Sequence, residues 1–265
     1  MSDQKLWASG QAYDAYVGRW SRLVAPEFIR WLGPEHNRDW IDVGCGTGEL
    51  TAAILAAADP RSIRGVDPSD EHLDFARDRF RSEPRVAFAA GHAQALPCDD
   101  ASSDYVVSGL ALNFAEDPAA GVVECARVAR AGGMIAAYVW DYGGEMQMMR
   151  RFWDAAAELD PAALQFDEAA RYAMCRPDVL TEMFQRADLT SVETRAIDVP
   201  TIFRDFDDYW TPFLSGQAPA PRYAMSLDEY KQPALRELLR SRLPAAPDGS
   251  ISLIARAWAV RGVNR

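Results

Sequence analysis

Several features that mark well-known classes of protein are scarce or absent in this sequence. The three histidines form no metal-ligand cluster, which argues against a zinc site. The four cysteines are scattered without CxxC spacing, so reduced thiols in a cytoplasmic protein are the simplest interpretation. No apolar run approaches the ~20 residues of a membrane-spanning helix, and the start Met-Ser-Asp-Gln-Lys has no apolar signal core.

Positive charge is also in short supply. The chain has 28 basic and 39 acidic residues and therefore a net charge of −11. A negative net charge opposes binding to a phosphate backbone or to an anionic membrane. We therefore expect neither nucleic acid nor membrane as a partner. There is no internal repeat or low-complexity tract. The 265 residues, 49% of them hydrophobic and 25% charged, suit one large globular domain or one domain with insertions.

The strongest local signal is the segment Ile-Asp-Val-Gly-Cys-Gly-Thr-Gly-Glu-Leu at residues 41–50. An apolar run meets three alternate glycines, Gly44, Gly46 and Gly48, and an alanine-rich stretch follows, which predicts strand, tight turn and helix. The glycines let the backbone approach a ligand closely, and the helix start offers free N–H groups at the same place. The third glycine comes one residue too early for the dinucleotide pattern GxGxxG, which disfavours an NAD-dependent oxidoreductase.

Residues 42–48 resemble motif I, (D/E)-x-G-x-G-x-G, of the class I S-adenosylmethionine (SAM) dependent methyltransferases. Two later segments sharpen the resemblance to the large group that includes the ubiquinone- and menaquinone-pathway enzymes (methyltransferase type 11-like). Residues 91–97, Gly-His-Ala-Gln-Ala-Leu-Pro, resemble its G-D-A-x-x-L-P, with His92 in place of the aspartate. Residues 127–133 resemble its R-V-L-(R/K)-P-G-G, with alanines in place of Leu and Pro. The ordered motifs cover residues 40–142.

This resemblance implies an α/β fold: a Rossmann-like seven-stranded class I methyltransferase sheet, six strands parallel and one antiparallel, with helices on both faces and helical lid insertions. The expected strands lie at residues 40–43, 62–67, 86–90, 103–108, 134–140, 191–199 and, antiparallel, 251–260. Gly18 and Pro26 are expected to break the N-terminal helical stretch, and residues 130–133 to form a glycine-capped helix end.

We interpret residues 1–265 as a single methyltransferase domain. Within it we expect an N-terminal helical cover at 1–35, a SAM-binding core at 36–142, and two helical insertions at 143–175 and 200–235. The insertions are rich in aromatic residues and methionine, which suggests a lid over an apolar or planar substrate.

The resemblance also implies where the cofactor would be bound. The expected contacts are Arg19, Gly44, Cys45, Gly46, Gly48, Asp67, Pro68, His92, Ala93, Ser108 and Gly109. Asp67 follows Gly48 by 19 positions, close to the ~20-residue spacing at which an acidic side chain meets ribose hydroxyls in Rossmann-like folds. A carboxylate can accept hydrogen bonds from both hydroxyls at once. As a cap for the helix that follows, Ser69 fits better than Asp67.

Two of these contacts have alternatives that the sequence leaves open. His92 can accept from the adenine amino group or stack on the ring, or it can turn away and leave the contact to the Ala93 backbone. A guanidinium suits the cofactor carboxylate. Arg19 is the choice for that role, Arg22 is close behind, and a solvated surface arginine is an equal alternative.

The substrate is poorly marked. Candidate acceptor contacts are Tyr16, Asn113, Asp141 and Tyr142, although Asn113 could equally cap the following helix. The sulfonium methyl is already activated, so much of the catalysis is positioning, and a general base is needed only for an acceptor that holds its proton tightly. We expect a SAM-dependent methyltransferase acting on a small molecule, with S-adenosylhomocysteine (SAH) as product. The alternatives are a non-catalytic SAM-binding protein (a sensor or partner subunit) and an RNA methyltransferase, which the charge disfavours.

Overall fold

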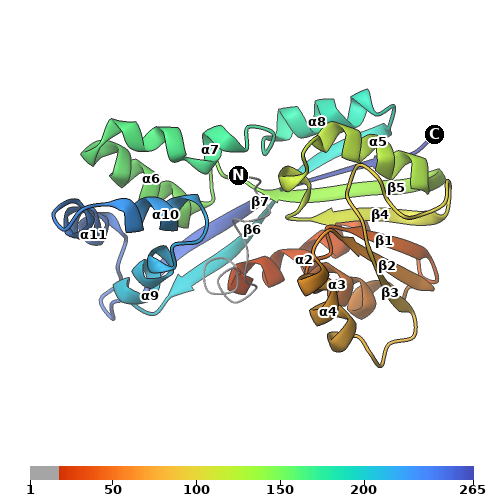
Figure 1. Cartoon of the computed structure of the whole chain (residues 1–265), viewed down its shortest axis with the longest axis horizontal. Helices are drawn as coiled ribbons and strands as arrows, with labels where there is room; N and C mark the ends of the chain where they lie inside the picture. The colour runs from red at the N-terminus through yellow and green to blue at the C-terminus, as the bar shows by residue number, and fades with distance from the viewer. Residues whose placement is uncertain (1–17) are drawn as a thin grey trace. The chain divides into compact units, whose positions relative to one another are not determined.

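The computed structural model describes residues 18–265 (Figure 1). In this part of the chain seven strands form one sheet in the order β3-β2-β1-β4-β5-β7-β6. Six strands are parallel and one, β7, is antiparallel, as predicted. The strands are β1 (Asp39–Val43), β2 (Ser62–Asp67), β3 (Val86–Ala90), β4 (Ser103–Gly109), β5 (Ala129–Trp140), β6 (Thr190–Phe203) and β7 (Ile251–Val263).

Helices cover both faces of the sheet. Figure 1 shows α3 (Glu49–Ala58) and α4 (Asp70–Arg79) on one face, and α5 (Pro118–Val128) and α8 (Pro177–Arg186) on the other. The central strands β1 and β4 are almost entirely buried, as expected of parallel strands covered on both faces. Helix α5 begins with a side-chain cap from Asp117 to the Ala120 N–H and a proline at its first position.

The expected break at Pro26 is wrong. Helix α2 (Arg19–Leu32) runs through Pro26 without interruption. A proline inside a helix removes one backbone hydrogen bond and costs about 3 kcal/mol. Here the helix buries Val24, Phe28 and Leu32 along one stripe, and burial of three such side chains at about 1.5–3 kcal/mol each outweighs that cost.

The expected glycine-capped helix end at residues 130–133 is also wrong, because β5 already begins at Ala129. The end of α5 is capped from the far end of the chain instead. The Asn264 side-chain amide donates to the carbonyls of Ala126 (3.0 Å) and Ala129 (2.9 Å), and its backbone N–H donates to the Gly133 carbonyl (2.8 Å). The carbonyls that a glycine cap would satisfy have partners, so the strand can start five residues earlier than expected.

The chain divides into two compact units, which we describe separately. The sheet unit comprises residues 21–139, 176–197 and 258–265. The helical unit comprises, among described residues, 18–20, 140–175 and 198–257. Both expected insertions, 143–175 and 200–235, fall within the helical unit. The interpretation of the whole chain as a single domain stays a prediction.

The helical unit is held together by aromatic side chains. Phe152 stacks on Phe213 with ring centroids 4.5 Å apart, and Tyr209 donates its hydroxyl to the Met148 carbonyl (2.9 Å). Such pairs add to the free energy already gained by burying the rings. The helices of this unit include α6 (Gln147–Leu159), η4 (Pro161–Phe166), α7 (Glu168–Arg171), α9 (Phe206–Trp210), η5 (Thr211–Leu214), α10 (Pro219–Ser226) and α11 (Lys231–Arg242).

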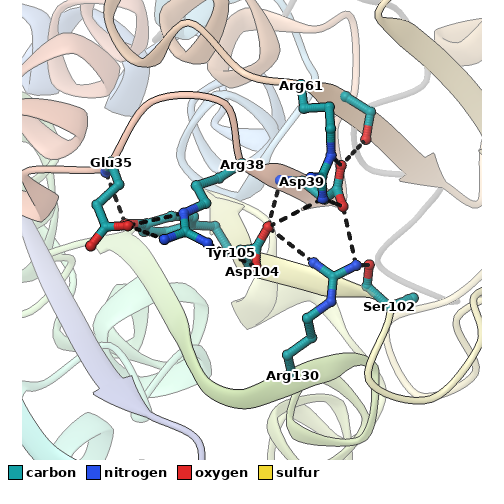
Figure 2. A network of polar contacts seen from close by, with 9 residues as sticks. Glu35, Arg38, Asp39, Arg61, Ser102, Asp104, Tyr105 and Arg130 are labelled. Carbon is teal, nitrogen blue, oxygen red and sulfur yellow. Dashed lines mark hydrogen bonds and ion pairs between the residues drawn. The ribbon is translucent and has the colours of Figure 1, made fainter.

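An ion-pair network closes the amino-terminal edge of the central strands (Figure 2). Arg130, near the start of β5, reaches Asp104 on β4 (3.0 Å) and Asp39 on β1 (3.1 Å). Arg61 donates to Asp39 (2.8 Å), and this hydrogen bond holds the pKa of Asp39 well below its usual range. Partly exposed pairs of this kind contribute little each. Together, these ion pairs link β1, β4 and β5 at the edge of the sheet that lies opposite the predicted cofactor residues.

Candidate cofactor site

The parallel register places the predicted cofactor residues of the sheet unit at one edge of the sheet. Val43 pairs with Val66, Asp67 with Ala90, and Asp42 with Val107. The glycine turn, Asp67, the loop at 91–93 and the end of β4 therefore all follow neighbouring carboxyl ends. The strand order reverses between β1 and β4, and open α/β sheets bind ligands at such a switch point.

The three glycines of the turn have different surroundings. All have positive φ: +71° at Gly44, +51° at Gly46 and +88° at Gly48. A Cβ on Gly44 would clash with the Ala111 Cβ, and one on Gly48 would lie 2.5 Å from the Phe80 ring. A Cβ on Gly46 would meet no atom within 4 Å. Gly44 and Gly48 therefore serve close packing, whereas Gly46 faces open space.

Backbone hydrogen bonds fix this turn in front of helix α3. The Val66 carbonyl accepts from the Gly44 N–H (2.7 Å) and the Cys45 N–H (3.1 Å), and Gly48 N–H donates to the Cys45 carbonyl (2.9 Å). Gly48 precedes the helix and provides no side-chain cap. The start of α3 therefore keeps N–H groups for a ligand or solvent.

Asp67 is buried at the end of β2 and oriented by two backbone groups. Its Oδ2 accepts from the Gly46 N–H (2.9 Å) and its Oδ1 from the Ser69 N–H (2.9 Å). Ser69 caps helix α4 by accepting from the His72 N–H (3.3 Å), which confirms the preference for Ser69 over Asp67 as the cap. The Asp67 carboxylate lies beside the glycine turn.

His72 was not among the predicted site residues. Its Nδ1 lies 3.4 Å from Asp67 Oδ1, and the neighbouring Asp67 carboxylate raises the pKa of His72. The sequence does contain a signal, because His72 stands three residues after the cap Ser69, in the first turn of α4. That turn follows directly on the strand that ends at Asp67.

Asp42, the acidic residue of the motif, is completely buried behind the turn. Thr51 Oγ1 donates to its Oδ2 (2.7 Å), while Oδ1 has no hydrogen-bond partner among residues 18–265. Burial raises the pKa of Asp42 to about 7; the Thr51 hydrogen bond opposes this rise, and the nearby charge of Asp67 adds to it. Thr51 was also missed, although it lies in the first turn of α3, nine positions after Asp42.

The predicted residues Cys45, Pro68, His92 and Ala93 lie in the loops that follow β1, β2 and β3. Burial, with the nearby Asp42 and Asp67, raises the pKa of the Cys45 thiol, so it stays protonated. The Gly91 N–H donates to the Asp67 carbonyl (3.2 Å), and the His92 carbonyl accepts from the Ala95 N–H (3.0 Å) in the following turn. The His92 side chain is exposed, as is Pro68; Ala93 lies in the turn itself. The adenine contacts stay predictions.

Two buried polar atoms without partners mark the end of β4. Ser108 Oγ and Asn113 Nδ2 have no hydrogen-bond partner in the described part of the chain, and both residues are buried. Asn113 lies in the short helix η3 (Leu112–Phe114) and does not cap α5, because Asp117 does. Between them, Gly109 packs against the Tyr138 ring and leaves no room for a Cβ. Buried polar groups are nearly always satisfied, so these two are available to a polar ligand.

The predicted contacts Arg19, Asp141 and Tyr142 lie in the helical unit. Arg19 pairs with Asp208 (3.0 Å) and lies over the Trp20 ring (4.3 Å), so its guanidinium has an internal partner. Asp141 Oδ2 accepts from the Glu145 N–H (2.9 Å), and Tyr142 packs on Tyr172 with centroids 5.1 Å apart. Tyr16 lies outside the described residues, and Arg22 belongs to the sheet unit.

Residues 41–137, which hold every sheet-unit residue of the predicted site, match a family model described as "Methyltransferase domain". This segment belongs to that methyltransferase family. The methyltransferase segment contains both the glycine turn and Asp67. No group of three or more potential metal ligands is found among residues 18–265, and no helix in that range is long and apolar enough to cross a membrane.

Curated relatives support the same family. An uncharacterized methyltransferase of Mycobacterium tuberculosis is 38% identical over 132 residues, which is 50% of this chain and 51% of the relative. A demethylmenaquinone methyltransferase of Staphylococcus aureus is 35% identical over 105 residues, 39% of this chain and 44% of the relative. The match to this chain therefore spans about half the length of the curated relatives.

Solved structures extend the similarity of the methyltransferase fold to the whole chain. The phosphoethanolamine N-methyltransferase 2 of Haemonchus contortus, in complex with S-adenosyl-L-methionine, superposes with a TM-score of 0.62 at 15% identity. The match covers 100% of this chain and 60% of that one. At this identity the likeness concerns the fold.

Proposed function

We propose that the chain binds SAM at the carboxyl edge of the sheet unit and transfers its methyl group to a small organic molecule, releasing SAH. One observation carries the proposal: the open face of Gly46 and the Asp67 carboxylate adjoin each other, joined by a 2.9 Å hydrogen bond. A ligand with a vicinal diol can approach the turn there without meeting a Cβ and find an acceptor beside it.

The residues present fit an adenosyl cofactor. Asp67 supplies a carboxylate for the ribose hydroxyls, and the uncapped start of α3 offers N–H groups close to the same turn. At the end of β4, the partnerless Ser108 Oγ and Asn113 Nδ2 supply polar groups for the amino-acid part of the cofactor or for the acceptor. We assign the backbone of Ser108 and Gly109 to the methionine part, and the loop of His92 and Ala93 to adenine.

The cofactor brings an activated methyl group, and the task of this chain is to position and shield it. The turn and Asp67 fix the ribose, and the fixed ribose limits where the methyl can point. Asn113 is the described residue that we choose to orient an acceptor, because it is buried, its amide nitrogen has no partner among residues 18–265, and it lies four positions after the end of β4. We assign no general base. Asp141 Oδ2 is engaged within its own loop, and the Cys45 thiol is held protonated.

For the acceptor we propose a small apolar or planar molecule. Its support is the composition of the helical unit, where aromatic residues gather and where Leu164 and Phe166 remain about half exposed. We infer that the insertions 143–175 and 200–235 form a lid that excludes water during transfer. The acidic net charge of −11 opposes an RNA substrate. We keep the cytoplasm as the proposed location.

The test is acceptor-dependent formation of SAH, measured by mass spectrometry. Purified protein with SAM would be supplied with phenols, quinols, amines and a metabolite extract. We expect SAH to accumulate with one acceptor class and the Asp67→Ala variant to need more SAM for the same rate. Tight SAM binding without acceptor-dependent SAH from any of these would favour the non-catalytic alternative, a sensor or partner subunit.

A further inference from the structure

A histidine lies against the carboxylate that we assign to the cofactor ribose. His72 Nδ1 is 3.4 Å from Asp67 Oδ1. The imidazole comes from the first turn of α4 and the carboxylate from the end of β2, and the Ser69 cap fixes the start of the helix between them. Asp67 is 6% exposed, so there is little room for it to turn away from His72.

The acceptor capacity of Asp67 is limited. A carboxylate has about four lone-pair sites. Two of them are used by the N–H groups of Gly46 and Ser69. The two ribose hydroxyls of an adenosyl cofactor would need the other two. A protonated His72, whose Nδ1 lies 3.4 Å from Oδ1, therefore competes with one hydroxyl for that oxygen.

We propose that His72 is a positioning residue for Asp67, and that loss of its positive charge weakens its hold on the carboxylate oxygen that one cofactor hydroxyl needs. The inference rests on the proposed cofactor site. Affinity for the cofactor then rises as the pH rises through the His72 titration. By linkage, cofactor binding lowers the pKa of His72.

Other charged groups near His72 must be separated from its effect. Asp42 on β1 also titrates near neutral pH, with a pKa raised to about 7. Glu71 on the same helix favours protonated His72. On the same face of α4, Arg79 is paired with Glu49 of α3 (2.7 Å). Arg77 and the Cys45 thiol are further charged and titratable groups near the turn, and His92 is exposed in the next loop.

The first experiment needs no substitution. The chain has three histidines, and their imidazole carbon–proton signals can be titrated by NMR in tag-free protein with and without saturating SAH. His36→Gln and His72→Gln would assign the signals. In free protein we expect a His72 pKa above that of an ordinary histidine, and a fall of about one unit when SAH is bound, which corresponds to a tenfold linkage. In the free Asp67→Asn variant, the pKa of His72 should return to that of an ordinary histidine.

Calorimetry with SAH from pH 5.5 to 8.5 provides the second readout. Wild-type protein and the control His36→Gln should bind SAH about tenfold more weakly at pH 5.5 than at pH 8.5. The His72→Gln variant should lose most of this pH dependence. An Asp42→Asn variant should keep the part of the pH dependence that comes from the titration of His72.

Two outcomes would overturn the inference: SAH binding that leaves the His72 pKa unchanged, or a His72→Gln variant with the wild-type pH profile. Either would leave the cofactor site standing. Absence of SAH binding at every pH, in wild type and variant alike, would instead refute the proposed function and the inference with it.

Discussion

Gly46→Ala separates the packing of the glycine turn from its proposed use as a cofactor cradle. The new Cβ would meet no protein atom within 4 Å, so the variant should fold. Its φ of +51° lies in the left-handed region, where a residue with a Cβ pays about 1–2 kcal/mol. We therefore expect a modest loss of stability. The same Cβ would occupy the open space that we assign to the ligand, where overpacking costs about 1–3 kcal/mol, or about fivefold to over a hundredfold in SAH affinity.

Gly33→Ala is the matched control. Gly33 has a similar φ of +58° and also meets nothing within 4 Å, but it lies just after α2, away from the carboxyl edge. Thermal unfolding should show equal losses of a few degrees for both variants. Calorimetry with SAH should show weaker binding for Gly46→Ala alone. Equal SAH affinities in the two variants would refute the proposal that the cofactor lies against Gly46.

Three further changes test separate parts of the structure. Asp67→Ala should weaken SAM binding by about 1.5–3 kcal/mol, the range for hydrogen bonds to a charged group; unchanged calorimetric affinity would show that Asp67 is not the ribose ligand. Asp42 has a pKa raised to about 7 from 3.8, so its contribution to stability is present below pH 4 and lost as the pH rises through 7. Asp42→Asn should accordingly gain stability over wild type at pH 8, by at most about 4 kcal/mol, and little at pH 4; urea unfolding at the two pH values checks this, and a pH-independent difference would contradict it. Asn264→Ala should cost about 1–3 kcal/mol because carbonyls at the end of α5 lose their donor; wild-type urea stability would mean that solvent replaces Asn264.

Local sequence signals predicted the glycine turn, and the family resemblance that these signals carry implied the sheet. Alternate glycines after an apolar run allowed one strand–turn–helix arrangement, and the spacing to Asp67 placed an acid at the end of the next strand. Parallel register then brought both to one edge. The N-cap at Ser69 was equally local, because its hydroxyl accepts from the His72 N–H three residues later.

Contacts between distant segments were not predictable in the same way. Asn264 caps a helix that ended 136 positions earlier, at Val128, so the beginning of β5 could not be read from residues 129–133 alone. Pro26 stayed inside α2 because the burial of its stripe outweighs one lost hydrogen bond. Arg19 carries the donors of a carboxylate ligand, yet its partner Asp208 is 189 residues away. Its predicted contact with the cofactor stays a prediction.

The identity of the methyl acceptor cannot be predicted from the sequence, for a physical reason. Cofactor binding uses backbone geometry and one carboxylate, which leave a pattern in the sequence. Acceptor binding by apolar side chains leaves only a composition, such as the aromatic residues of the helical unit. Asn113 is the exception, since its buried amide nitrogen has no partner among residues 18–265 and favours a polar acceptor group on the ligand.

Isothermal titration calorimetry at pH 8 with SAM, SAH and NADH tests the central claim most directly. The account predicts micromolar binding of SAM and SAH, none of NADH, and a marked loss for SAM and SAH in Asp67→Ala. Binding of NADH without SAM or SAH, or no binding of any of the three by folded protein, would contradict it.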